Sequence, residues 1–275
     1  QVERASGFLE RSQDWAERAQ ASAQGRGDAV GEALVAVELG RTRMNQGDYD
    51  VAIDLLTPAL PVLDAAGEDV AAGEAHRTLA ILHMARGRWA ESTDAFERAL
   101  LRFGAVGGAV KAGFCRVGLA QVARHQKRYD AAREQLNAAR EGFEAIGYRM
   151  GRAECANGLG EIARMTGDLS TAERCYRDAL ALYEELGSID VPVAQANLGL
   201  VQSARGDWMG ARQSLDSSRR MLALEQRRDL EAAACAALLA PTAAARDFDA
   251  FDRCLARALD LLERTGFVYS DIAIE

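Results

Sequence analysis

Hydrophobic and polar positions along the chain recur with a period close to 40 residues. The stretch GDYDVA, which begins at residue 47, returns in altered form as GRWAES, KRYDAA, GDLSTA, GDWMGA and RDFDAF, beginning at residues 87, 127, 167, 206 and 246. A leucine stands eight residues before each copy, and a small residue follows it in five of the six. Self-similarity at a fixed period is the signature of stacked supersecondary units, so the repeat predicts the fold.

Each repeat is predicted to contain two antiparallel helices joined by the GDYDVA stretch. Gly47 and Asp48 suit a turn and a helix N-cap, because an Asp side chain can accept the unpaired N–H groups of the next helix. Twenty residues after the start of each copy stands a glycine, with Gln226 as the single exception. That glycine suits a left-handed residue after the second helix. The stretch is therefore predicted to be a structural joint rather than a catalytic motif.

These columns resemble the tetratricopeptide repeat family, whose signature is a Leu-Gly pair, then Gly-x-Tyr-x-x-Ala, then a later large residue and Ala. The fourth repeat, NGLGEIARMTGDLSTAERCYRDALALYEELG, shows the resemblance best. The resemblance implies an all-α fold, a right-handed superhelical solenoid of antiparallel helix pairs. The period exceeds the common length of about 34 residues, and it is similar to the 40-residue type of kinesin light chains and bacterial signalling proteins.

The whole chain, residues 1–275, is predicted to form a single array. A half repeat is expected at about 1–30, and a truncated repeat begins at GFVYSDIAIE. Full repeats are expected at about 33–72, 73–112, 113–152, 153–191, 192–231 and 232–271. Because the chain starts with Gln1 and ends within a repeat, we interpret it as a piece of a longer protein. Pro241 is predicted to kink a helix, because proline removes a helical hydrogen bond.

Composition narrows the function classes. Hydrophobic residues make up 49% of the 275 residues and there are only four prolines, as in an Ala/Leu-rich helical protein. The net charge of -8 argues against a nucleic-acid partner, since phosphate binding depends on clustered cations. No run of about 18 apolar residues suggests a membrane span. Five cysteines without a CxxC pair indicate neither a disulfide framework nor a zinc site, so a cytoplasmic location is expected.

The sequence offers no candidate catalytic residue, metal site or cofactor site. GAVGGAVK at 104–111 lacks the GK[ST] ending of a phosphate-binding loop and coincides with a turn between repeats. RDFDAFD, from residue 246, has no glycine at the sixth position of its acidic run and no glutamate at the twelfth, as a calcium loop would need. The chain itself is therefore not expected to be an enzyme.

The first helices of the repeats are expected to line a concave groove that binds a protein or peptide segment. Asparagine amides there can pair with an extended backbone, and arginines can hold carboxylates or phosphates. The alternative is that these are solvated residues, with charges such as Glu161 and Arg164 paired three apart. The predicted groove residues are Arg41, Arg77, Gln121, Arg124, Asn157, Glu161, Arg164 and Asn197.

Three functions follow from this picture. The leading hypothesis is a non-enzymatic protein-interaction scaffold, serving a larger bacterial signalling protein such as a Ser/Thr kinase or a regulatory ATPase. The first alternative is a sensor whose groove binds a small effector. The second is a self-association module that forms a homo-oligomer through exposed repeat ends.

Overall fold

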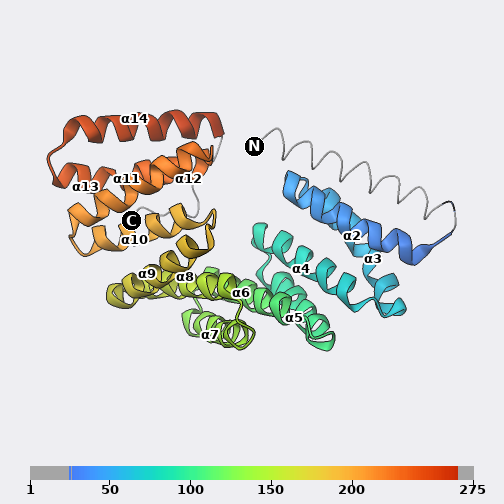
Figure 1. Cartoon of the computed structure of the whole chain (residues 1–275). Coiled ribbons are helices and arrows are strands. Elements are labelled where there is room, and N and C mark those ends of the chain that lie inside the picture. Colours follow the sequence, from blue (N-terminus) through green and yellow to red (C-terminus); the bar gives the residue numbers. More distant parts are fainter. Residues whose placement is uncertain (1–24, 26, 266–275) are drawn as a thin grey trace. The chain divides into compact units, whose positions relative to one another are not determined.

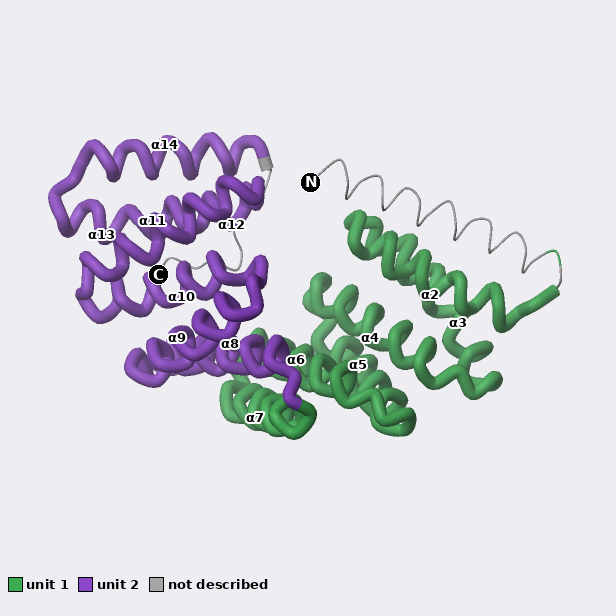
Figure 2. Tube along the Cα trace, viewed as in Figure 1, with its two compact units in different colours: residues 1–146 green, residues 147–275 purple. Residues whose placement is uncertain are grey.

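The computed structural model describes residue 25 and residues 27–265, and within them it contains helices and no strand. The predicted all-α class is confirmed. The chain divides into two compact units, residues 1–146 and 147–275 (Figure 2). Each unit is built of helices that pack in consecutive pairs (Figure 1). The truncated repeat at 266–275 and most of the predicted half repeat lie outside the described residues.

The first unit holds three helix pairs in its described part. They are α2 (Ala29–Gln46) with α3 (Tyr49–Ala66), α4 (Asp69–Ala85) with α5 (Trp89–Ala105), and α6 (Ala109–His125) with α7 (Tyr129–Ala145). Within this unit, α3 also packs on α4, and α5 packs on α6. The first helices α2, α4 and α6 contact one another in that order, so they form one surface of the unit.

The second unit continues the same alternation. Its helices are α8 (Arg149–Met165), α9 (Leu169–Leu186), α10 (Val191–Ala204), α11 (Trp208–Leu224), α12 (Arg228–Ala237), α13 (Leu239–Ala244) and α14 (Phe248–Thr265). The first helices α8, α10 and α12 again contact in order. The predicted kink is confirmed, since Pro241 has no N–H for the Ala237 carbonyl and α12 ends there.

The turns at both ends of the second helices α3, α5, α7, α9 and α11, and the turn before α14, hold a residue in the left-handed conformation. Gly47 has a φ of 86°, and its N–H donates to the Met44 carbonyl at 3.1 Å. The equivalent joint positions also have positive φ, at Gly87, Lys127, Gly167, Gly206 and Arg246. Gln226, the exception in the glycine column, keeps a φ of 59°. The stretch is therefore a joint, as predicted, and the backbone geometry persists where glycine does not.

The aspartate of the joint caps the following helix in some repeats. Asp168 and Asp207 each accept a hydrogen bond at 3.0 Å, from the N–H groups of Thr171 and Gly210. The cap predicted for Asp48 is wrong, because its side chain makes no cap bond and pairs with Arg43 instead. Side-chain capping therefore stabilises only some of the second helices, whereas every described joint has a left-handed residue.

Where the helices of a pair cross, a small residue of the first helix meets a large side chain of the second. A Cβ added to Gly113 would lie 2.4 Å from Cζ of Phe143, whose side chain is fully buried. Close packing of this kind leaves no room for an additional methyl group. Gly73 with Phe103 repeats this contact at the same column, and a similar contact at a second column of the repeat joins Gly40 with Leu56, Gly160 with Tyr176 and Gly199 with Leu215.

We expect Gly113→Ala to lower the free energy of unfolding by about 1 kcal/mol or more, because overpacking costs about 1–3 kcal/mol and exceeds the gain in helix propensity. Gly142→Ala is the matched control, since Gly142 lies in α7 with no atom within 4 Å of an added Cβ. That variant should be more stable by up to about 1 kcal/mol. Urea unfolding monitored by circular dichroism measures both, and a change of the same sign in both would contradict the contact.

Candidate functional site

All eight predicted groove residues lie on first helices, which agrees with their predicted placement. In the first unit they are Arg41 on α2, Arg77 on α4, and Gln121 and Arg124 on α6. In the second unit they are Asn157, Glu161 and Arg164 on α8 and Asn197 on α10.

In the second unit, three predicted residues meet in one hydrogen-bonded chain. Nδ2 of Asn197 donates to Oδ1 of Asn157 at 3.0 Å, across the 40 residues that separate neighbouring repeats. Nδ2 of Asn157 lies 3.4 Å from Oε1 of Glu161, one turn along α8. All three side chains are half-buried. Each amide nitrogen has two hydrogens and each amide oxygen can accept two bonds, so these contacts leave donors and acceptors for a ligand.

A second carboxylate lies on the same face of α8. Glu154 precedes Asn157 by one turn and accepts a hydrogen bond from the Tyr183 hydroxyl of α9. Burial raises the pKa of Glu154, and the nearby charges of Asp190 and Glu161 raise it further. Burial also raises the pKa of Tyr183. The face around the asparagine pair is therefore acidic.

Arg164, the remaining predicted residue of this unit, lies exposed at the end of α8. The ion pair with Glu161 that was considered from their spacing is not found among the described contacts of Arg164. The hydrogen-bonded chain therefore includes Asn157, Glu161 and Asn197 but not Arg164.

In the first unit, Arg77 is already engaged by a carboxylate. Its Nη2 lies 2.9 Å from Oε2 of Glu74, and Nζ of Lys111 lies 2.6 Å from Oε1 of the same residue. Burial alone would raise the pKa of Glu74, but the hydrogen bonds and charges of Lys111 and Arg77 outweigh it and hold the pKa below its usual value. Sequence analysis missed Lys111, which comes from the next repeat and also lies 5.4 Å from the Phe103 ring centre.

The other predicted residues of the first unit do not gather around Arg77. Arg41 pairs with Glu38 at 3.0 Å on the exposed side of α2. Arg124 is half-buried, with Nη2 3.5 Å from Nε2 of His125, and Gln121 is exposed. The first unit therefore offers one compact charged group, Glu74 with its two cations, and separate polar side chains on α2 and α6.

Within the described residues, no group of three or more His, Cys, Asp or Glu side chains could hold a metal ion. In the same part of the chain, no helix is both long and apolar enough to cross a membrane. The polar groups that converge are amides, carboxylates and cations, which recognise a ligand by hydrogen bonds and charge.

Residues 115–185 match the model of the tetratricopeptide repeat family. This segment spans α7, α8 and most of α6 and α9, and the helix pairs on either side repeat the same joints and small-to-large contacts. The chain therefore contains tetratricopeptide repeats. A search of curated proteins gives no match.

Solved structures of low sequence identity share the fold. BtubC (BKLC) from P. vanneervenii is 24% identical, with a TM-score of 0.64 over 79% of this chain and 92% of that one. A Rap protein complexed with competence and sporulation factor is 14% identical, with a TM-score of 0.64 over 85% of this chain and 76% of that one. The third is a Signal Transduction ATPase with Numerous Domains (STAND) protein with a tetratricopeptide repeat sensor, PH0952 from Pyrococcus horikoshii. It is 14% identical, with a TM-score of 0.70 over 85% of this chain and 36% of that one.

Glu154→Gln should stabilise the chain at pH 7, because it removes a buried charge and keeps an acceptor for Tyr183. The pKa of Glu154 is higher in the folded chain than in the unfolded chain, so the charged carboxylate destabilises the folded state. This destabilisation is fully present above the folded-state pKa. We expect the melting temperature to rise by a few degrees at pH 7, the size that about 1 kcal/mol gives in a chain of this length. The difference should disappear below about pH 4, where the carboxyl is protonated in both states.

Differential scanning calorimetry at both pH values measures this effect, with Glu184→Gln on the exposed side of α9 as the control. A gain that is equal at both pH values, or equal in the control, would contradict a destabilising charge at Glu154.

Proposed function

We propose that the chain is a protein-binding module whose first helices receive an extended segment of a partner protein. The observation that carries the proposal is the hydrogen bond between Asn157 and Asn197, which links equivalent faces of the neighbouring first helices α8 and α10. An amide both donates and accepts, and so it complements the N–H and C=O groups of an extended backbone.

The spacing of the helices suits such a segment. Packed helices lie about 8–10 Å apart, and an extended chain rises about 3.3 Å per residue. About three residues of the segment therefore pass each first helix. Because the amides of Asn157 and Asn197 are bonded to each other at 3.0 Å, they would bind neighbouring groups of the backbone, while the side chains on either side of that point remain free to determine specificity.

The charges near the asparagine pair favour a particular kind of segment. Glu154 and Glu161 make this face of the second unit acidic, so a segment with neutral or basic side chains fits it better than an acidic one. That Arg77, Arg124 and Arg164 hold carboxylates or phosphates stays a prediction. Arg77 already pairs with Glu74, so a ligand carboxylate would have to displace the Glu74 carboxylate in order to bind Arg77.

We further propose that the module serves a larger bacterial signalling protein, such as a Ser/Thr kinase or a regulatory ATPase, and that it acts in the cytoplasm without catalysis of its own. The likeness to the sensor-bearing ATPase and to the Rap protein supports a signalling role. Cys115, Cys155 and Cys235 are buried in the helical core and form no disulfide, which fits a reducing compartment.

Self-association is the second candidate. Phe248 and Leu259 on α14 are 63% and 53% exposed, and Leu255, which lies between them on the same face, is 37% exposed. Sedimentation velocity tests this candidate: a dimer that Leu259→Glu converts to a monomer would support it, and a parent chain that is monomeric at every concentration would exclude it.

Asn197→Ala should weaken the binding of peptides that are selected on the parent chain from a random display library. We expect a loss of about tenfold, because one or two backbone hydrogen bonds contribute about 1 kcal/mol each. Fluorescence anisotropy of labelled peptides measures the affinity, and circular dichroism verifies that the variant is folded.

The matched control is Asn137→Ala, at a half-buried asparagine on the second helix α7. Equal losses in both variants, or no loss in Asn197→Ala, would contradict the assignment of the binding face. A library that yields no binder would contradict peptide binding itself and shift the proposal to a small effector.

A further inference from the structure

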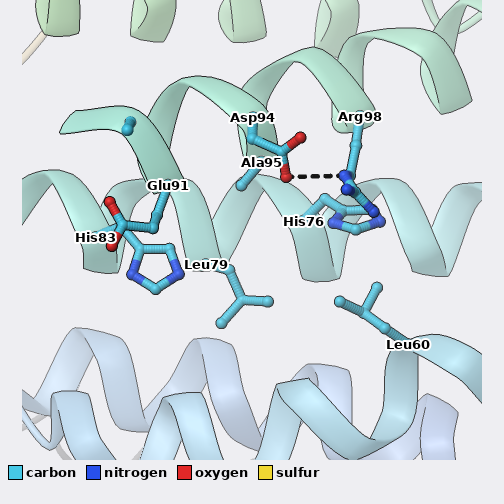
Figure 3. Close-up of a pocket in the computed structure, with 9 residues that line it drawn as sticks. Leu60, His76, Leu79, His83, Glu91, Asp94, Ala95 and Arg98 are labelled. Atoms are coloured by element: carbon cyan, nitrogen blue, oxygen red, sulfur yellow. Dashed lines mark ion pairs between the residues drawn. The ribbon is translucent and has the colours of Figure 1, made fainter. Parts of the chain in front are cut away.

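Two open surfaces of the first unit have carboxylates that pair with cations of the chain. One is a pocket of about 520 Å³ between α3, α4 and α5, where Asp94 pairs with Arg98 at 2.8 Å (Figure 3). The other is the face of the first helices, where Glu74 of α4 pairs with Arg77 and Lys111. The chain therefore supplies its own cations to these carboxylates.

The repeat places a second carboxylate at the position of Glu74. Glu74 and Glu154 each stand 13 residues before the joint of their repeat, which begins at residue 87 in one case and at residue 167 in the other. Both lie on a first helix, α4 or α8, and both are half-buried. The surroundings of the two carboxylates can therefore be compared position by position, each within its own unit.

In the first unit, a lysine from the next repeat binds this carboxylate. Nζ of Lys111 lies 2.6 Å from Oε1 of Glu74, and Nη2 of Arg77 lies 2.9 Å from Oε2. The Lys111 ammonium also lies 5.4 Å from the centre of the Phe103 ring, which is a cation–π distance. The two cations hold the pKa of Glu74 below its usual value, so the ionised carboxylate is stable there.

In the second unit, the equivalent positions hold an amide, a carboxylate and another aromatic ring. Counted from the joints at residues 167 and 206, they are Asn157 in place of Arg77, Asp190 in place of Lys111 and Tyr183 in place of Phe103. Neither Glu154 nor Asp190 forms an ion pair with a described residue. The charge of Asp190 and burial both raise the pKa of Glu154. Two carboxylates and a ring are therefore present without the ammonium that the first unit has at this place.

A ligand can reach these two carboxylates. Glu154 and Asp190 are half-buried. A Glu154 oxygen that the Tyr183 hydroxyl leaves unbonded is open to solvent, because the buried unbonded side-chain atoms in the described part of the chain belong to other residues. Arg227 reaches the residue before Asp190, but its Nη1 donates to the Ile189 carbonyl at 2.7 Å. Glu154 and Asp190 therefore remain available to a cation of a ligand.

We propose that the partner segment carries a lysine whose ammonium group binds Glu154 and Asp190, in the place that Lys111 fills in the first unit. This inference rests on the proposed function, in which the segment crosses α8 and α10 at the asparagine pair. Glu154 precedes Asn157 by three residues, about 4.5 Å along the helix, so the four-carbon stem of lysine can extend from the bound backbone to the carboxylate. Lysine fits better than arginine because Tyr183 already bonds to Glu154, whereas a guanidinium fork uses both carboxylate oxygens.

Asp190→Lys tests this place without a partner. The introduced ammonium should pair with Glu154 as Lys111 pairs with Glu74, and the melting temperature should exceed that of the neutral control Asp190→Asn by a few degrees. The gain should vanish when Glu154→Gln is added. Differential scanning calorimetry measures all of these variants. Equal melting temperatures of Asp190→Lys and Asp190→Asn, or a gain that persists with Glu154→Gln, would overturn the cation site.

Peptides that are selected on the parent chain from a random display library should share a lysine. Each is synthesised with an acetylated N-terminus, once with that lysine and once with norleucine, which lacks the ammonium group. The replacement should weaken binding about tenfold on the parent chain and less than twofold on Glu154→Gln. Glu184→Gln, an exposed position on α9, is the control and should keep the tenfold difference. Fluorescence anisotropy measures the affinities.

The outcomes separate this inference from the proposed function. Peptides that depend on Asn197 but share an arginine or no cation, or that lose as much affinity on Glu154→Gln, would overturn the lysine site and leave the backbone site intact. Loss of binding on acetylation would assign the ammonium to the N-terminus of the peptide and also overturn the lysine site. A library that yields no binder would overturn the proposed function and this inference with it.

Discussion

The contact between a small residue on each first helix and a large side chain on its partner sets the distance at which the two helices of a pair cross. Gly113 shows this contact most clearly. A Cβ added to it would lie 2.4 Å from Cζ of Phe143, and the Phe143 ring is fully buried and has no space to move away. Because contacts of this kind recur in five helix pairs, from α2 with α3 to α10 with α11, the first helices of these pairs are held close to their partners in a similar way. The exposed faces of neighbouring first helices consequently meet in register, as Asn157 and Asn197 do.

Much of this arrangement could be predicted from the sequence, because it depends on local backbone geometry. The joints, the small-to-large columns and the break before Pro241 each follow from the residue types at a few positions. The boundary between the two compact units has no such signal, since Gly147 occupies the same column as Gly107 and has nearly the same φ. Repeat phase fixes a turn, but it does not determine how strongly two neighbouring pairs pack together.

The candidate sites were predictable only in part, for a related reason. Helical periodicity placed the predicted groove residues on first helices, but the hydrogen bond between Asn157 and Asn197 was not predicted. The partners of those residues depend on side-chain reach between repeats. Lys111 extends to Glu74 from the next repeat, and Tyr183 bonds to Glu154 although its column is one of large core residues.

The central claim is that the asparagine pair of the second unit binds the backbone of an extended partner segment. The most direct measurement is a crystal structure of the chain with a tightly bound peptide. The account predicts a peptide that crosses α8 and α10, with the amide groups of Asn157 and Asn197 bonded to its main chain. A peptide that lies on the second helices, or that crosses the first helices without main-chain contact to either asparagine, would contradict it.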